Sequence, residues 1–254
     1  MSFDPRTYTA SPTELEGRVI AITGASGGIG RAVAAACAGH GANVILIGRN
    51  TRKLEAVHAE IEAAGGPEPV IALLDLEKAL AADYDQIATA VLGRYGRLDG
   101  LVHGAGILGA LSPIEHFDVP TWYRVMHVNV TAAFALTHVL IPALKRSADA
   151  SVIFTSSGVG RRGRAYWGAY AVSKFALEGF SQVLASELEG STAVRVNTLN
   201  PGRARTLMRR QAYPAEDAST LPMPESLTGP YIALLGPGSR GVTGGAFDCQ
   251  GPER

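Results

Sequence analysis

The sequence predicts an α/β fold, a single doubly wound parallel sheet of the Rossmann type with helices on both faces. Apolar runs of four to six residues alternate with longer helical patterns along the chain, and this alternation is typical of βαβ units. The runs are uniformly apolar, as expected of strands that are buried on both faces. Because 254 residues suit one large α/β unit, we expect residues 1–254 to form a single domain.

Each element follows from its own stretch of sequence. Short apolar runs predict strands at 18–22, 43–47, 70–74, 100–103, 151–155, 194–199 and 246–248. Ala-rich or amphipathic stretches between them predict helices at 30–39, 51–64, 84–95, 121–146 and 170–189. No repeat or low-complexity tract interrupts this order.

Two segments depart from the alternation. Residues 1–16 are polar and lack the apolar core of a secretory signal, so we expect an N-terminal arm. Residues 202–226 contain scattered prolines, several charges and little periodicity. They follow the carboxyl end of a predicted strand, where α/β proteins bind ligands. We interpret this segment as a lid over a substrate site; a surface excursion without a role is the alternative.

The composition argues against several classes of protein. Lys+Arg and Asp+Glu both number 23, so the chain lacks the basic excess of a nucleic-acid-binding protein. Its two cysteines, Cys37 and Cys249, form neither a disulfide framework nor a cluster with metal spacing, so we expect a reducing cytoplasm and no metal. The longest apolar stretch, 131–144, is shorter than the roughly 20 residues that span a bilayer, so we expect no membrane insertion.

A glycine-rich turn directly after the first predicted strand indicates a dinucleotide site. Residues 23–30 read TGASGGIG and lead into a predicted helix. Glycines allow a tight turn and close approach of backbone to a pyrophosphate, and the helix N-terminus directs free N–H groups toward it. Because the strand, the turn and the helix occur in the order that this fingerprint requires, we predict that the turn binds a dinucleotide cofactor.

The end of the second predicted strand indicates which dinucleotide binds. An NAD site usually has an acidic residue there to hold the ribose 2′-hydroxyl, but this chain has Gly48-Arg49-Asn50. Gly48 leaves room for a 2′-phosphate, and a guanidinium can pair with that phosphate through two hydrogen bonds. We therefore predict NADP(H) rather than NAD(H). A solvated surface arginine is the alternative interpretation of Arg49.

Three polar residues indicate acid–base chemistry. Tyr170 and Lys174 are four residues apart, which places them on one face of a helix. A nearby cation favours a phenolate, so we expect the pKa of Tyr170 to lie below its usual value near 10. Ser157 follows the strand predicted at 151–155, at the sheet edge where the cofactor crevice is expected. A Tyr-x-x-x-Lys pair alone is common, so the indication of an active site depends on the combination.

Together these residues resemble the short-chain dehydrogenase/reductase family over nearly the whole chain. The matching positions, in order, are the turn at 23–30, Asp75, Ala105-Gly106, Asn129, Ser157, Tyr170, Lys174, Pro201-Gly202 and Thr206. The stretches at 154–161 and 167–170 are also similar to a bacterial YciK-like branch of that family. The similarity to this branch does not identify a substrate.

The resemblance implies a role for each matched position. Tyr170 would be the acid–base group, Ser157 would bind the substrate oxygen, and Lys174 would bind the nicotinamide ribose. Asn129 would hold a water molecule that extends the proton relay. The positions expected to contact the cofactor are Gly24, Ser26, Gly28, Ile29, Gly30, Arg49, Asn50, Asp75, Leu76, Gly106, Tyr170, Lys174, Pro201, Gly202 and Thr206.

Two stretches depart from the family pattern. His103-Gly104 stands where the family commonly has Asn-Asn. We interpret His103 as a structural residue, because other side chains already fill the catalytic roles. At the carboxyl end, Asp248-Cys249-Gln250-Gly251 replaces the frequent Asp-Gly-Gly.

We predict an oxidoreductase that transfers a hydride between NADP(H) and a small carbonyl or alcohol substrate, with ketone or aldehyde reduction as the favoured direction. A 3-oxoacyl thioester reductase is one alternative, and an NADP(H)-binding regulatory protein without turnover is another. The resemblance also implies a homodimer or homotetramer, built partly from the helices predicted at 121–146 and 170–189.

Arginines gather near the expected mouth of the substrate site. They are Arg161, Arg162, Arg164, Arg203, Arg205, Arg209 and Arg210. Their local excess is compatible with an anionic substrate and equally with a solvated basic rim. The sequence leaves both interpretations open.

Overall fold

Parallel strands form the centre of the computed structural model, which describes residues 3–251. The sheet has seven strands in the order β3-β2-β1-β4-β5-β6-β7. The first three strands are added in one direction across the sheet. After β3 the chain crosses back to place β4 beside β1 and continues in the other direction. The strands are β1 Val19–Thr23, β2 Asn43–Gly48, β3 Val70–Leu73, β4 Gly100–His103, β5 Ala150–Thr155, β6 Val194–Asn200 and β7 Ala246–Asp248. Every neighbouring pair is parallel. This doubly wound sheet confirms the predicted fold class.

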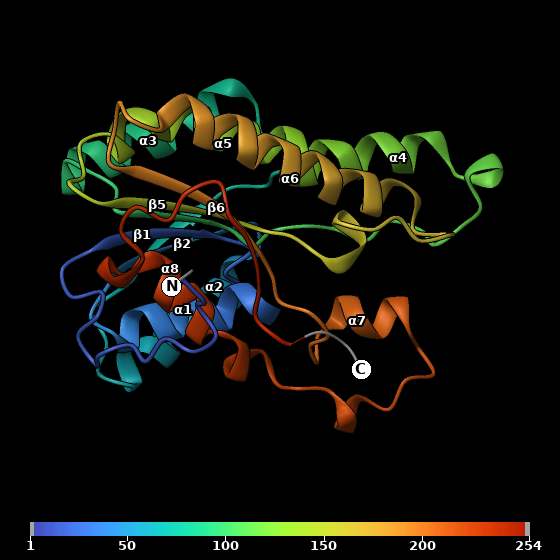
Figure 1. The fold of residues 1–254 in the computed structure, drawn as a ribbon, viewed down its shortest axis with the longest axis horizontal. Helices are drawn as coiled ribbons and strands as arrows, with labels where there is room; N and C mark the ends of the chain where they lie inside the picture. The colour runs from blue at the N-terminus through green and yellow to red at the C-terminus, as the bar shows by residue number, and fades with distance from the viewer. Residues whose placement is uncertain (1–2, 252–254) are drawn as a thin grey trace.

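Helices cover both faces of the sheet (Figure 1). On one face lie α1 Gly28–Gly39, α2 Thr51–Ala63 and α8 Gly229–Leu235. On the other lie α3 Ala81–Tyr95, α4 Val119–Met126, α5 Ala132–Leu144 and α6 Gly168–Leu188. The short helix α7, Leu207–Ala212, stands outside both layers (Figure 1).

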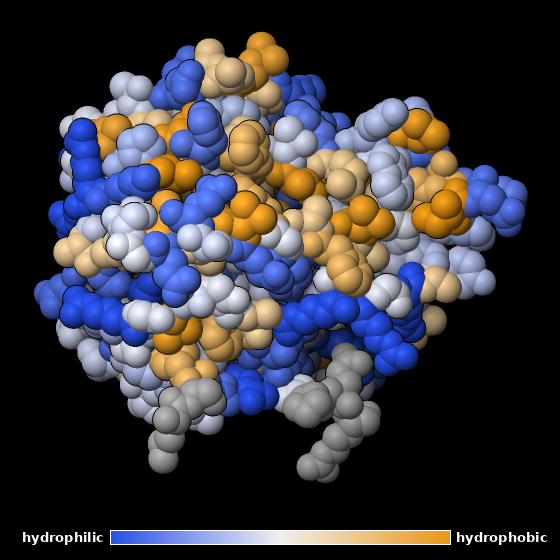
Figure 2. Space-filling view, turned by 45° about the horizontal axis from the view of Figure 1, so that its top comes forward, coloured by the Kyte–Doolittle hydropathy of each residue, from blue (hydrophilic) through white to orange (hydrophobic). Residues whose placement is uncertain are grey.

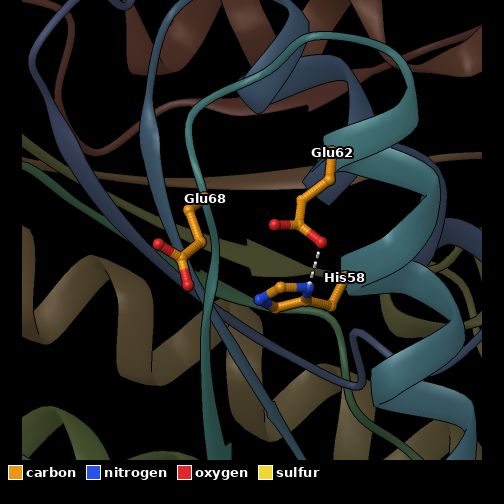
Figure 3. A group of neighbouring side chains, drawn as sticks. All are labelled: His58, Glu62 and Glu68. Atoms are coloured by element: carbon orange, nitrogen blue, oxygen red, sulfur yellow. Dashed lines mark ion pairs between the residues drawn. The ribbon is translucent and has the colours of Figure 1, made fainter.

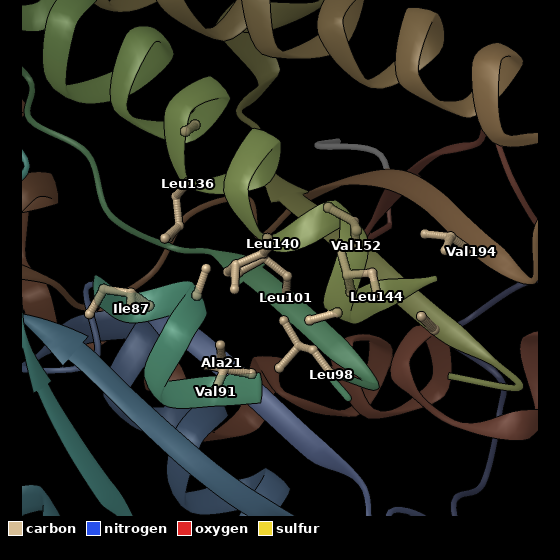
Figure 4. Close-up of a cluster of buried hydrophobic side chains, with 14 of the residues drawn as sticks. Ala21, Ile87, Val91, Leu98, Leu101, Leu136, Leu140, Leu144, Val152 and Val194 are labelled. Atoms are coloured by element: carbon tan, nitrogen blue, oxygen red, sulfur yellow. The ribbon is translucent and has the colours of Figure 1, made fainter. Parts of the chain in front are cut away.

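Two hydrophobic clusters hold these layers together. Successive residues of β1 point to opposite faces, so Ala21 packs in the cluster under α3, α5 and α6, while Ile20 packs in the cluster over α1, α2 and α8. Figure 4 shows the first cluster, in which Leu136 and Leu140 of α5 meet Leu101 of β4. Because both faces of the strands are buried, their sequences are uniformly apolar.

The helix predicted at 121–146 is present as one helical stretch, Val119–Leu144, but it is not a uniform α-helix. It consists of α4, a π-helical segment at His127–Thr131 that was not predicted, and α5. The carboxylate of Asp118 caps α4 by accepting a hydrogen bond from Thr121 N at 2.8 Å. A π segment inserts an extra residue into a helical turn, which apolar periodicity does not reveal.

Helix α8 was not predicted. Its seven residues, GPYIALL, are buried from Pro230 onward. So short an apolar run shows no helical period and is equally typical of a strand. The other boundaries differ from the predicted ones by only a few residues, as they do between assignment methods.

The N-terminal arm packs against the domain instead of extending from it. Leu15 is fully buried in the cluster with α1 and α8, and its N–H donates to the carbonyl of His40 at 3.0 Å. The Phe3 ring meets Phe247 of β7 edge-on at 6.3 Å. The first residues of the arm lie outside the described range.

The helical stretch from α4 through α5, Val119–Leu144, is long and apolar enough to cross a membrane by length and composition alone. It is longer than the stretch at 131–144 on which the sequence argument relied. Close to half of its most apolar window, 44%, is buried inside the protein. It packs beside α3 and α6 on one face of the sheet, which is the placement of a core helix (Figure 1).

Candidate active site

A cleft of about 610 Å³ lies at the carboxyl ends of the central strands, a volume in the range usual for ligand sites. Every position predicted to contact the cofactor lines this cleft. Ser157, Tyr170 and Lys174 line it too, whereas Asn129 lies just behind its wall. Residues from distant parts of the sequence are thus brought together as predicted, and their individual roles stay predictions.

The glycine-rich turn forms a cradle that side chains would fill. Gly24 has a φ of +70°, and a Cβ on it would lie 2.9 Å from the backbone of Ala105. A Cβ on Gly30 would lie 2.3 Å from the carbonyl oxygen of Gly24. The turn therefore needs glycine at both positions, and it leaves the N-terminus of α1 open toward the cleft. A pyrophosphate fits this combination of bare backbone and free N–H groups.

Charged side chains gather at the end of the cleft beyond β2. Arg49 Nη1 lies 3.0 Å from Glu77 Oε2 and 3.5 Å from Asp75 Oδ1. Arg124 also binds Glu77, at 2.8 Å, and the two arginines lower the pKa of that carboxylate. Lys53 lines the same end. Arg49 is thus held in place by acids at the position where a 2′-phosphate is expected.

Two of these residues, Glu77 and Lys53, were missed by sequence reasoning. Lys53 could have been found, because Asn50 caps α2 and the residue three positions later lies in the first turn. Glu77 has no comparable signal, since it lies in a turn after β3 and meets Arg49 only in the folded chain.

Lys174 is buried at the end of the cleft where Ser157 and Tyr170 lie. Its Nζ donates to the carbonyl of Thr155 at 2.7 Å and lies over the Tyr170 ring, 5.6 Å from the centroid. Burial lowers the pKa of Lys174 to about 8, and the nearby carboxylate of Glu178 acts in the opposite direction. The lysine therefore stays mainly protonated at neutral pH.

The expectation of a lowered pKa for Tyr170 is wrong for this structure. Burial raises the pKa of Tyr170 to about 12, and a hydrogen bond with Ser157 opposes that rise. The physical reason is that desolvation disfavours the phenolate, while the Lys174 ammonium sits over the ring face and is engaged by Thr155. Tyr170 is therefore a protonated phenol at neutral pH.

Asn129 lies in the π-helical segment between α4 and α5. Its Oδ1 accepts from Ile107 N at 2.8 Å, and its Nδ2 donates to Ile107 O and to Ser173 Oγ. The side chain thus joins the loop after β4 to α6, next to Gly106 in the cleft wall. Local irregularities of this kind are frequent at functional sites. The implied water-holding role of Asn129 stays a prediction.

A buried polar network behind the site was not predicted. Glu178, one turn after Lys174 on α6, accepts hydrogen bonds from Ser156, from Thr198 at 2.7 Å and from Arg161 at 3.2 Å. Arg161 also binds Asp248 of β7 at 2.8 Å. This network ties α6 to β5, β6 and β7 around the predicted catalytic residues. Its members are too far apart in sequence for a spacing rule to find.

The unusual carboxyl-terminal stretch supports the start of the 202–226 segment. Gln250 Nε2 donates to the carbonyls of Pro201 and Arg203, both at 2.7 Å. These carbonyls flank Gly202, which has a φ of +72° and lines the cleft. The departure from Asp-Gly-Gly therefore provides an amide that holds this loop.

His103 occupies a structural position. It is buried, its ring stacks on Phe154 at 4.8 Å, and its Nε2 lies 2.8 Å from Thr137 Oγ1. Burial lowers the pKa of His103 to about 3, so the imidazole is neutral. Since Thr137 donates its own proton to Ala133 O, it is His103 that donates to Thr137. It does not line the cleft.

Among residues 3–251, one group of side chains outside the cleft has metal-ligating chemistry (Figure 3). His58 and Glu62 lie one turn apart on α2 and form an ion pair at 3.1 Å, and Glu68 faces them from the loop before β3. The ligand atoms lie within 4.8 Å of one another. None of the three lines the cleft, and the expectation of no metal stays a prediction.

The sheet, the glycine cradle and the Ser157, Tyr170 and Lys174 constellation define a dinucleotide-dependent oxidoreductase. Comparison with known proteins specifies the class. The short chain dehydrogenase family profile matches residues 18–217. The chain belongs to the short-chain dehydrogenase/reductase family, in its YciK-like branch, which confirms the resemblance found in the sequence.

Three relatives illustrate the similarity. Oxidoreductase YciK of Escherichia coli strain K12 is 47% identical over 243 residues, covering 96% of each chain. A short chain dehydrogenase from Pseudomonas syringae is 53% identical with a TM-score of 0.95, covering 96% of this chain and 98% of that one. A structure from Shigella flexneri 2a strain 301, complexed with NADP, is 45% identical with a TM-score of 0.92, covering 95% of this chain and all of that one.

Proposed function

We propose that this oxidoreductase reduces a ketone or aldehyde with NADPH, or oxidises the corresponding alcohol with NADP⁺. The observation that carries the proposal is the meeting of Ser157, Tyr170 and Lys174 in the same cleft as the glycine cradle. The bound cofactor supplies or accepts the hydride. The protein orients the substrate and manages one proton.

The protonation states suit carbonyl reduction at neutral pH. Tyr170, with a pKa raised to about 12, carries the proton that the forming alkoxide requires. Ser157 lies within hydrogen-bonding reach of Tyr170, so one substrate oxygen can contact both hydroxyls. The Lys174 ammonium, which lies over the Tyr170 ring, favours the negative charge that develops on the substrate oxygen. Asn129 supports the same wall through Ser173.

The choice of NADP(H) rests on Arg49 and Lys53 at the end of the cleft beyond β2. A guanidinium and an ammonium there favour a 2′-phosphate, whereas an acid in place of Arg49 would repel it. The relative from Shigella flexneri was solved with NADP. The residues of this chain therefore fit the phosphorylated cofactor.

A regulatory protein without turnover is the less favoured alternative, because a cofactor-binding module does not need Tyr170 and Lys174 in contact. We also propose a homodimer or homotetramer and a cytoplasmic location. Exposed apolar residues on α5 and α6 support the assembly, and two free cysteines are compatible with a reducing compartment.

Replacement of Tyr170 by Phe tests the proposed chemistry. The ring is retained, so the fold and NADPH affinity should survive, while carbonyl reduction should fall by about 10²–10⁴-fold. In wild-type protein, alcohol oxidation should increase as the pH rises toward the high pKa of Tyr170, and the Phe variant should lose this dependence. NADPH affinity is measured by calorimetry and turnover by absorbance at 340 nm. A Tyr170→Phe protein with near wild-type turnover would reject the mechanism.

A further inference from the structure

Apolar side chains form part of the lining at the catalytic end of the cleft. Beyond Tyr170, its lining includes Leu108, Trp167, Leu207 and Met208. Arg49, Lys53 and the two acids Asp75 and Glu77 line the cleft at its other end, by β2 and β3. Within the described residues, the charged side chains that line the catalytic end are Lys174 and Arg209.

Several of the arginines near this end are directed to partners in the protein. Arg209 is the one member of the group of seven that lines the cleft. It forms a bidentate ion pair with Glu216, both hydrogen bonds at 2.6 Å, and its guanidinium lies 3.9 Å from the centroid of Tyr213. Arg164 donates to the Tyr213 hydroxyl at 2.6 Å, and Arg161 belongs to the Glu178 network. The structure thus favours internal pairing over an anion site.

Trp167 is held in the cleft by an unusual backbone. The preceding residue, Tyr166, has a φ of +73°, which a bulky side chain rarely adopts. Its carbonyl accepts a hydrogen bond from Ser112 N at 3.0 Å. The following Gly168 also has a positive φ, and a Cβ there would lie 2.6 Å from the Phe117 ring. Strain of this kind persists where the surrounding structure enforces it, often at functional sites.

The Trp167 ring joins the catalytic tyrosine to the 202–226 segment. Its centroid lies 5.8 Å from that of Tyr170 and 5.9 Å from that of Tyr213. The apolar part of a substrate packed against Trp167 would therefore extend from the Tyr170 hydroxyl toward Tyr213, at the end of α7. Helix α7 contributes Leu207, which is 62% exposed and available for such a contact.

We infer that the substrate is an uncharged, predominantly hydrocarbon ketone or aldehyde, bound with its apolar part against Trp167. This inference rests on the proposed function. A carboxylate or phosphate near the carbonyl would lose its hydration on entering this end, where Arg209 is already committed to Glu216. In this interpretation, the paired arginines Arg164, Arg205 and Arg209 stabilise the 202–226 segment.

A matched pair of ketones tests the inference. Acetophenone and 4-acetylbenzoate share the ring and the carbonyl and differ by one carboxylate. With NADPH, kcat/KM should be at least tenfold higher for acetophenone. Calorimetric titration of NADP⁺-saturated protein should show the same order of affinity, which gives a readout independent of turnover. Equal or better binding of 4-acetylbenzoate would overturn the inference.

Substitution of Trp167 tests its position. Trp167→Ala should raise KM for acetophenone by tenfold or more, and Trp167→Phe should retain most of the affinity. Met223→Ala is the control, because Met223 is an exposed apolar residue that does not line the cleft. If Trp167→Ala behaves like Met223→Ala, the inference fails.

The two levels of proposal fail in different ways. Turnover of 4-acetylbenzoate in preference to acetophenone, still abolished by Tyr170→Phe, would reject the substrate class and keep the reductase. Binding of acetophenone beside Trp167 with no NADPH oxidation would reject the reductase and keep the apolar site. Preference for a coenzyme A thioester over the same thioester of uncharged N-acetylcysteamine would also reject the substrate class.

Discussion

Arg49 is the residue on which we propose that cofactor preference depends. Its guanidinium is held by Glu77 and Asp75, yet it is about half exposed, so a 2′-phosphate can reach it. Arg49→Ala should weaken NADPH binding by about 1–3 kcal/mol, roughly 5- to 150-fold, through loss of a charge-assisted pair. NADH binding should change little.

Calorimetry with both cofactors measures this difference. Arg52→Ala is a matched control, because Arg52 is an exposed arginine three residues later, in the first turn of α2, and does not line the cleft. Equal affinity of the wild-type protein for NADPH and NADH would contradict the assignment.

Lys174 gives a prediction about pH. Its pKa is lowered to about 8 by burial and is supported by Glu178, so the ammonium is lost as the pH rises through that value. We expect kcat/KM for carbonyl reduction to decline above about pH 8. Glu178→Gln removes the supporting negative charge, which lowers the pKa of Lys174 further and moves the decline to lower pH.

Rate profiles from pH 6 to 10 measure this shift, with thermal unfolding as a check that Glu178→Gln retains its fold. Glu178→Asp keeps the charge and should restore most of the wild-type profile. If kcat/KM of a folded Glu178→Gln protein declines at the same pH as that of the wild type, Glu178 neither positions Lys174 nor raises its pKa.

The sequence predicts where the site lies better than it predicts the pKa values of the residues in it. The positions at 23–30, Ser157 and Tyr170 could be assigned to one cleft because parallel strands end at the same sheet edge. The pKa of Tyr170 could not be predicted correctly, because spacing shows that Lys174 is near but not that the phenol is desolvated. Glu178 lies one turn after Lys174, but its contacts with Ser156, Thr198 and Arg161 are tertiary and no local pattern indicates them. The contact of Glu77 with Arg49 is likewise tertiary.

Among the helices and strands, long periodic or strongly apolar segments could be predicted from the sequence. Irregular helical segments and very short helices could not. The strands needed little beyond their apolar runs, since both faces are buried. The π segment at His127–Thr131 and the short helix α8 escaped prediction because neither produces a period of its own. The π segment nonetheless carries Asn129, which lies just behind the cleft wall, and Val128, which lines the cleft, so an unpredicted element also contributes to the site.

The loop at 201–203 gives a prediction about cofactor binding. Gln250 holds it through two hydrogen bonds to backbone carbonyls. Gln250→Glu keeps the size of the side chain and removes the donor, so it should loosen the loop and weaken NADPH binding by about tenfold, as two lost hydrogen bonds allow. Faster proteolysis of the 202–226 segment should accompany this loss.

Affinity and limited proteolysis are compared with Gln86→Ala, a substitution on the exposed side of α3 remote from the cleft. If Gln250→Glu binds NADPH like wild type and resists protease equally, Gln250 does not hold this loop.

In the part of the chain that the structure describes, the outer face of α5 and α6 has no covering layer. Phe134 of α5 and Val172, Phe175 and Val183 of α6 each expose between 41% and 56% of their surface. Figure 2, which brings these helices forward, shows apolar side chains among the polar ones on this side of the molecule. Exposed apolar groups of this kind often mark an interface between proteins.

We expect this face to pair with a second copy about a two-fold axis, which is the commonest symmetry of homo-oligomers. Light scattering at micromolar concentration should then give a particle of at least twice 26.5 kDa. Phe134→Glu or Val183→Glu should shift it toward the monomer, because a carboxylate buried in the interface would lose its hydration without a partner. Met223→Glu, on an exposed residue of the 202–226 segment, should leave the assembly intact. A wild-type particle of 26.5 kDa would contradict the pairing. If the oligomer persists in both the Phe134→Glu and the Val183→Glu variants, its interface lies on another face.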